Sequence, residues 1–324
     1  MNAIDPMTQS TVSSGTGNRS IGAILIDTGK LTLDNAERIL HFQKEHGLQF
    51  GDAAKRLGLL TDADIQFALA RQYDYPYLLA GEGLVSEELI AAYEPFSPQV
   101  EALRGLRSQL MLRWFTDEAE RKTLAIASPG RNEGRSYLAA NLAVVFSQLG
   151  EHTLLIDADL RNPRQHQLFG LENRSGLSSL LSGRGDVADV QRIPSFVDLS
   201  VLAAGPMPPN PQELLGRPAF ARLLDEFSRE FDVVIIDTPA GRDYADIQTI
   251  AVRASGALLV ARKHQTSLVK LGAMHEALRR MGVQLVGSVV SEFRSDTNRS
   301  RLSAIDTMPS GAAAVQSNGR ASVA

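Results

Sequence analysis

The chain has 324 residues, a formal net charge of −4 and no cysteine, and 44% of its residues are hydrophobic. This composition is typical of a soluble protein with room for one large and one small domain. It excludes disulfides, thiolate zinc sites and a cysteine nucleophile, gives no indication of nucleic acid binding, and lacks any apolar run near the ~18–20 residues that span a bilayer. We therefore expect a cytoplasmic protein that reaches a membrane only through a partner.

Composition divides the chain into five segments. Residues 1–19 and 294–324 are polar and aperiodic, which predicts two disordered ends. Residues 79–97 are predicted to be a linker between a small domain at 20–78 and a larger domain at 98–293.

The small domain contains an internal repeat with an offset of about 29 residues. The residues that open the first copy, Ile21–Leu25, recur in type as Phe50–Ala54. Each copy continues with a glycine suited to end a helix and, three residues later, a threonine suited to cap the next one: Gly29 and Thr32, then Gly58 and Thr61. Two such helix–turn–helix units can pack their apolar faces together, so we expect a small helical domain.

Beyond residue 98 the pattern changes to alternating helices and strands. A helix is predicted at about 98–115 and another from Arg135 to Leu149. Short apolar segments predict strands at Thr123–Ala127, Thr153–Ile156, Leu199–Leu202, Val233–Ile236, Ala257–Val260 and Leu285–Val290. This alternation predicts an α/β fold with a mostly parallel sheet and helices on both faces.

A glycine-rich segment, Ser128–Ser136, lies between a predicted strand and a predicted helix. Backbone amides of such a loop can cradle phosphates, and the Ser136 hydroxyl can hold Mg²⁺. The segment departs from the usual P-loop pattern, because Pro129 replaces the first glycine and Arg135 replaces the lysine. By itself it could also be a turn before a core helix. As a P-loop, its predicted nucleotide-binding residues are Gly130, Arg131, Asn132, Glu133, Gly134, Arg135, Ser136 and Tyr137.

Two predicted strands end in carboxylates, which strengthens the P-loop interpretation. Asp157 and Asp159 follow the strand Thr153–Ile156, and Asp237 follows Val233–Ile236. Ligands of open α/β sheets bind at the carboxyl ends of the strands, where Mg²⁺ needs oxygen ligands. The sequence therefore predicts ATP binding with Mg²⁺ held by Ser136, Asp157 and Asp237.

With these motifs the sequence resembles the bacterial tyrosine kinase (BY-kinase) family over roughly residues 98–293. Asp157 and Asp159 match its second Walker motif, and Asp237 matches its Walker B motif. The segment Leu202–Leu215 resembles its proline-rich loop. Glu101, Arg104 and Arg107 match the family's ring-assembly motif, although the residues alone indicate only an exposed helix face with ion pairs.

The resemblance is greatest to the EpsG-type chain-length determinant kinases of exopolysaccharide biosynthesis. It implies a homo-oligomer that docks on the cytoplasmic segments of a transmembrane polysaccharide co-polymerase at the inner membrane. Residues 20–78 are similar to the N-terminal domain of type II secretion ATPases, which in some members binds cyclic di-GMP. Ser20–Gly22 and Phe50–Gly51 lack the arginine of the ligand-binding version, so we expect a protein-docking module rather than a cyclic di-GMP site.

Within this resemblance, Arg135 is expected to stabilise the γ-phosphoryl group, and Asp157, in preference to Asp159, to accept the proton of the nucleophile. Family members phosphorylate a C-terminal tyrosine cluster, whereas the six tyrosines here include none beyond Tyr244. A second hypothesis is therefore a nucleotide-gated assembly module with little phosphotransfer. A third, a partitioning-type ATPase of the MinD/ParA kind, is disfavoured because Gly130 stands where those proteins carry a signature lysine.

Overall fold

The computed structural model describes residues 19–72, 78, 84–116, 121–241, 245–294 and 299–306. The chain divides into two compact units, residues 1–79 and residues 80–324. Each unit is described by itself.

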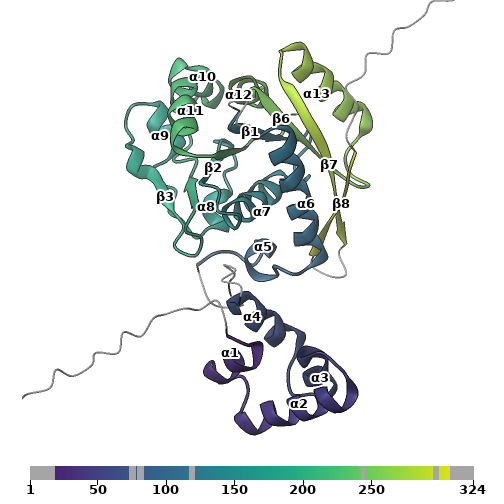
Figure 1. Cartoon of the computed structure of the whole chain (residues 1–324). Helices are drawn as coiled ribbons and strands as arrows, with labels where there is room; N and C mark the ends of the chain where they lie inside the picture. The colour runs from purple at the N-terminus through teal and green to yellow at the C-terminus, as the bar shows by residue number, and fades with distance from the viewer. Residues whose placement is uncertain are drawn as a thin grey trace, which may run out of the picture. The chain divides into compact units, whose positions relative to one another are not determined.

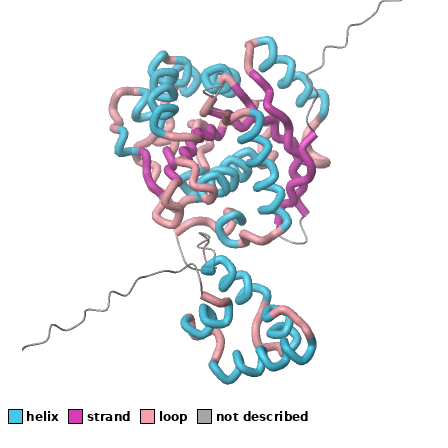
Figure 2. Tube along the Cα trace, viewed as in Figure 1, coloured by secondary structure: helices cyan, strands magenta, loops and turns pink. Residues whose placement is uncertain are grey.

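The described part of the first unit consists of helices and loops, without a strand (Figure 2). Its helices are α1 (Ile21–Asp27), α2 (Leu33–His46), α3 (Phe50–Arg56) and α4 (Asp62–Gln72). Their apolar faces meet in one core, in which Leu25, Ile39 and Ala53 are fully buried.

The two halves of this unit use the same local devices. Thr32 caps α2 by accepting a hydrogen bond from the Asn35 amide at 3.3 Å. Thr61 and Asp64 form a reciprocal capping box, in which the Asp64 amide donates to Thr61 Oγ1 at 3.2 Å and the Thr61 amide donates to Asp64 Oδ2 at 3.0 Å. A left-handed glycine follows the first helix of each half, Gly29 at φ 71° and Gly58 at φ 65°. The 29-residue periodicity of the sequence is thus a periodicity of helix boundaries.

The second unit is built on an eight-stranded sheet among the described residues, with the order β3-β4-β2-β5-β1-β6-β7-β8. The strands are β1 (Thr123–Ala127), β2 (Thr153–Asp157), β3 (Val190–Arg192), β4 (Leu199–Leu202), β5 (Val233–Asp237), β6 (Gly256–Arg262), β7 (Gln284–Arg294) and β8 (Arg299–Asp306). Neighbouring strands are parallel except for β3 and β8, which pair antiparallel at the two edges. The predicted α/β fold with a mostly parallel sheet is confirmed.

Helices cover both faces of this sheet (Figure 1). They are α5 (Ile90–Tyr93), α6 (Pro98–Arg113), α7 (Arg135–Ser147), α8 (Gln165–Leu168), α9 (Leu177–Leu181), α10 (Pro211–Gly216), α11 (Pro218–Glu230), α12 (Asp246–Ala254) and α13 (Leu268–Arg280), with a short 3₁₀ turn at Val187–Asp189. Alternate strand residues such as Leu154, Ile156 and Ile236 join one core with Phe220 and Ile250 of α11 and α12. Strand side chains alternate between faces, so Asp157 and Asp237 emerge on the opposite face, where α7 packs on β2 and β5.

Two regions differ from the sequence prediction. The stretch predicted as a disordered tail, 294–324, includes β8, which is paired to β7. Part of the predicted linker, 79–97, is packed on the second unit. There the fully buried Asn141 of α7 donates to the Glu88 carbonyl at 3.1 Å and accepts from the Ala91 amide at 3.0 Å. Asn141 lies 50 residues from Ala91 and 53 from Glu88 in the sequence, and β8 depends on its pairing with β7, so local composition alone reveals neither feature.

Candidate nucleotide-binding site

The candidate site lies where three parallel strands end side by side. β5 is hydrogen-bonded to β1 on one side and to β2 on the other. Asp157 and Asp237 are register partners at the ends of β2 and β5. The P-loop leaves β1 directly beside them and leads into α7, which begins at Arg135.

The backbone of the P-loop uses conformations that few residues adopt. Asn132 has φ 57° and Gly134 has φ 96°, both in the left-handed region. At Gly130 an added Cβ would lie 2.7 Å from Oε1 of Glu133. Glu133 is buried, and its carboxylate accepts from the Gly130 amide and from the Thr266 hydroxyl, each at 2.7 Å. The Glu133 side chain therefore stabilises the loop from within, and only the backbone of Glu133 is left to contact a nucleotide.

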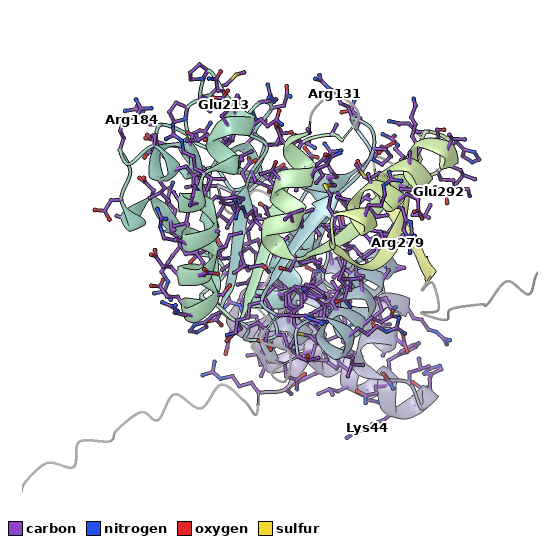
Figure 3. The ribbon with its side chains drawn as sticks, turned by 90° about the horizontal axis from the view of Figure 1, so that it is seen from above. Lys44, Arg131, Arg184, Glu213, Arg279 and Glu292 are labelled. Atoms are coloured by element: carbon purple, nitrogen blue, oxygen red, sulfur yellow. The ribbon has the colours of Figure 1, made fainter. Side chains whose placement is uncertain are left out.

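A cavity of about 520 Å³ opens above the loop. Arg131 to Tyr137 and Asp159, all predicted from the sequence, line it, together with Asn162, Pro163, Arg164, Gln167 and Ala240. Arg131 is exposed, and Figure 3 shows its side chain at the outer rim of the ribbon. The additional lining residues come mainly from the loop after β2, where they follow Asp159 directly; that adjacency is the signal that could have identified them.

Asp157 is fully buried beneath this cavity. Its carboxylate accepts hydrogen bonds from the backbone amides of Arg164 and Gln165, each at 2.9 Å, and of Asp159 at 3.2 Å. Burial raises the pKa of Asp157 well above its usual range, and the neighbouring Asp237 carboxylate raises it further. The amides of Gln165 and Arg164 lower the pKa of Asp157 but do not outweigh these effects.

Asp237 is also fully buried. Its Oδ2 accepts a hydrogen bond from the Gln165 amide side chain at 2.7 Å, whereas Oδ1 has no hydrogen-bond partner among the described residues. Burial raises the pKa of Asp237, while the Arg135 guanidinium, the Ser136 hydroxyl and Gln165 lower it. Gln165 also donates to the Ser136 carbonyl at 3.1 Å, so it connects the two predicted metal ligands. Sequence reasoning missed Gln165, because no motif marks it.

These residues fit Mg²⁺. Two adjacent buried carboxylates with raised pKa values need a cation, Oδ1 of Asp237 has no hydrogen-bond partner among the described residues, and the Ser136 hydroxyl interacts with the same carboxylate. No group of three or more histidine or acidic side chains in the described part of the chain could hold a metal alone. That agrees with Mg²⁺, which usually takes one or two protein carboxylates, several waters and the phosphates of the substrate.

Asp159 differs from the other two carboxylates because it faces the cavity. It keeps 7% of its surface exposed, and its Oδ1 accepts from the amides of Arg161 and Asn162, which closes the turn after β2. The next residues tie this turn to its surroundings. Arg161 pairs with the buried Asp246 of α12 at 2.7 Å, and Arg164 pairs with Glu88 at 2.6 Å.

Arg135, which stands at the P-loop lysine position, is buried within the loop. Its Nε donates to the Thr238 carbonyl at 2.8 Å, and Nη1 donates to the Gly130 carbonyl at 2.6 Å and to Ser128 Oγ. It still contributes to the wall of the cavity. The guanidinium thus connects the P-loop to the end of β5.

The predicted assembly residues lie on α6, away from the cavity. Glu101 and Arg104 form an ion pair of 3.1 Å in which Glu101 is 74% exposed. Arg107 instead donates to the Val145 carbonyl of α7 at 2.8 Å. The tyrosines Tyr73, Tyr75, Tyr77 and Tyr244 lie outside the described residues; Tyr93 donates its hydroxyl to the Val85 carbonyl at 2.7 Å.

A glycine-rich loop between a parallel strand and a helix, with carboxylates from two neighbouring strands beneath it, defines a P-loop nucleoside triphosphatase fold. No protein-family model matches the chain. The putative tyrosine-protein kinase CapB of Staphylococcus aureus is 35% identical over 207 residues, 64% of this chain and 90% of that protein. The putative tyrosine-protein kinase EpsB of Ralstonia solanacearum is 34% identical over 211 residues, 65% of this chain but 28% of that protein.

Among solved structures, the kinase domain of the Escherichia coli tyrosine kinase ETK matches with a TM-score of 0.60 at 30% identity, covering 62% of this chain and 78% of that one. The chain belongs to the bacterial tyrosine kinase family, as its motifs predict, and is a tyrosine-kinase-like P-loop enzyme. No helix in the described part of the chain is long and apolar enough to cross a membrane.

Proposed function

We propose that the chain binds ATP with Mg²⁺ in the cavity above the P-loop and transfers the γ-phosphoryl group to a tyrosine hydroxyl. The observation that carries this proposal is the pair of buried register partners, Asp157 and Asp237, beneath the loop. Two buried carboxylates with raised pKa values repel each other when both are ionised, and a bound cation would relieve this repulsion. Mg²⁺, when bound, neutralises charge on the β- and γ-phosphate oxygens.

In the proposed step, the bond between the γ-phosphorus and the oxygen that bridges it to ADP breaks. A bond forms between that phosphorus and the tyrosine oxygen, and the proton of the hydroxyl passes to a carboxylate. We assign this proton to Asp159, because it faces the cavity while Asp157 is fully buried and accepts from three amides. This reverses the preference drawn from the sequence. Asp157, Asp237 and Ser136 would hold Mg²⁺.

The assay follows transfer from γ-labelled ATP to a synthetic glutamate–tyrosine copolymer. We expect label on tyrosine with the wild-type chain, a loss of about 100-fold or more in Asp159→Asn, and normal transfer in Asp225→Asn, which alters an exposed carboxylate of α11. A wild-type chain that binds nucleotide but labels no tyrosine would contradict the kinase proposal. Full activity in Asp159→Asn together with loss of activity in Asp157→Asn would identify Asp157 as the proton acceptor instead.

For partners, we propose a homo-oligomer that docks on the cytoplasmic segment of a membrane-embedded polysaccharide co-polymerase and so regulates exopolysaccharide chain length. The match to EpsB fits a domain that works together with other segments, since it covers 28% of that longer protein. We expect Glu101→Ala with Arg104→Ala to shift the oligomer toward monomer in light scattering. Arg107 is unsuitable as a probe, because it also ties α6 to α7 within one chain.

A second candidate function is a nucleotide-gated assembly module with little phosphotransfer. One observation favours it: the guanidinium of Arg135 is engaged by carbonyls within the chain. Oligomerisation that depends on ATP, without label on the copolymer or on the chain itself, would support this candidate over the kinase.

A further inference from the structure

The carbonyl groups of the P-loop are held from outside the cavity by residues that lie between 130 and 158 positions further along the chain. Arg262, the last residue of β6, donates to the Asn132 carbonyl at 2.9 Å. Gln265, in the turn that follows, donates to the Arg131 carbonyl at 3.0 Å. On β7, the hydroxyl of the buried Ser291 donates to the Glu133 carbonyl at 3.2 Å.

These contacts determine which way the peptide groups face. In a trans peptide the C=O of one residue and the N–H of the next point in opposite directions, and no peptide bond of the described chain is cis. Holding the carbonyls of residues 131, 132 and 133 therefore directs the amides of Asn132, Glu133 and Gly134 the other way. The three donors do not line the cavity, whereas these three residues do.

The turn that supplies the donors is itself bound to the loop. The Thr266 hydroxyl accepts from the Arg262 amide and donates to the buried Glu133 carboxylate, both at 2.7 Å. The left-handed His264, at φ 62°, lets the chain reverse between Arg262 and Gln265. The turn and the loop thus share one hydrogen-bond network.

We propose that Arg262, Gln265 and Ser291 are positioning residues of the nucleotide site, which hold the P-loop amides toward the phosphates before a nucleotide arrives. The inference rests on the proposed nucleotide binding and adds to it. An isolated loop with two left-handed residues has many alternative conformations, so amides aimed in advance bind an anion with a smaller entropic cost. Arg135 holds the Gly130 carbonyl in the same manner from within the motif.

The test uses Gln265→Met and Arg262→Met, which keep much of the side-chain volume and remove the donor. Lys263→Met is the matched control: it removes a cation from the same turn, and its ion pair is with Glu292 rather than with the loop. The probes are Mg²⁺–ADP, followed with a fluorescent analogue, and inorganic pyrophosphate as competitor. Each donor variant is expected to weaken pyrophosphate binding by about three- to tenfold, with normal binding in Lys263→Met.

A purely structural role would lower the melting temperature and leave the intrinsic phosphate affinity of the folded protein unchanged. We expect instead a melting temperature near that of the wild type, together with faster hydrogen exchange of the amides at 132–134. Equal pyrophosphate affinity in all variants, or unchanged exchange at these amides, would overturn the inference while leaving the proposed function intact. A wild-type chain that binds neither probe would overturn both.

Discussion

Nε of Arg135 donates to the carbonyl oxygen of Thr238 at 2.8 Å, across 103 residues of sequence. Thr238 follows Asp237 and in turn donates its hydroxyl to the Ile126 carbonyl at 2.6 Å. The first residue of α7, the end of β5 and the end of β1 are therefore joined through two buried side chains, those of Arg135 and Thr238. In the P-loop pattern this position is a lysine, whose single ammonium has no planar fork to reach two carbonyls in this way.

Arg135→Lys is expected to separate the structural from the electrostatic role of this residue. Losing the bond to Thr238 should lower the free energy of unfolding of the nucleotide-free protein by about 1–3 kcal/mol, since a buried carbonyl is left without its charged donor. Nucleotide binding should persist, because the positive charge stays in the loop. Arg135→Met should lose both. Thermal unfolding with and without Mg²⁺–ADP measures the two effects, and equal stability of Arg135→Lys and wild type would contradict the assignment.

Asp237→Asn is expected to stabilise the nucleotide-free protein at neutral pH. Its side-chain oxygen can still accept from Gln165, and the buried negative charge disappears. Because burial raises the pKa of Asp237 in the folded state, the folded protein binds the proton more readily than the unfolded chain. The free energy of unfolding of the wild type therefore falls as pH rises from the unfolded value, ~3.9, through the raised folded pKa.

In Asp237→Asn this decline should be shallower, although Asp157 still contributes to it in the same direction. The gain at neutral pH should be roughly 1–3 kcal/mol. Stabilisation by Mg²⁺–ADP should be lost, since a proposed metal ligand is gone. Thermal unfolding between pH about 5 and about 8, with and without Mg²⁺–ADP, checks all three statements. A variant less stable than wild type at neutral pH would show that burial of the charged carboxylate does not destabilise the folded protein.

Arg161→Ala is expected to destabilise the second unit strongly. It leaves the carboxylate of Asp246, which is 1% exposed, without its ion-pair partner. Breaking a buried pair costs ~3–5 kcal/mol, and we expect about 2–4 kcal/mol here because 20% of the Arg161 side chain is exposed. Arg174→Ala is the control. Its pair with Glu172 is 88% and 73% exposed, so urea unfolding should change little.

Asp64→Asn should destabilise α4 in a pH-dependent manner. The Lys30 ammonium and the Thr61 hydroxyl lower the pKa of Asp64 to about 2. A depressed pKa contributes stability above the unfolded value, and this contribution disappears as pH falls from ~3.9 toward the folded value. The difference between variant and wild type should thus be present at pH about 6 and vanish near pH about 2. Hydrogen exchange of α4 peptides across a urea series measures it. Asp62→Asn, in the same turn but 76% exposed, should have a much smaller effect.

The sequence alone was sufficient for the class of fold and for the family. Strands and helices alternate with clear periodicity from residue 98, and the order of the P-loop, Asp157 and Asp237 carries enough information to identify the family. Such features are local or regularly spaced, so one sequence reveals them. The caps at Thr32 and Thr61 belong to the same category, because a capping residue and its helix are adjacent in the chain.

Tertiary structure decided what surrounds these motifs. Gln165 beside Asp237, Arg161 against Asp246, Asn141 under the segment at 88–91, and the turn at 262–266 behind the P-loop all join residues far apart in sequence. Their side chains are ordinary in composition and acquire a role only through the order of strands, which places β6 beside β1, β7 beside β6 and β2 beside β5. Hydrogen bonds and buried charges depend on distance in space, and the strand order that sets those distances cannot be read from any one segment.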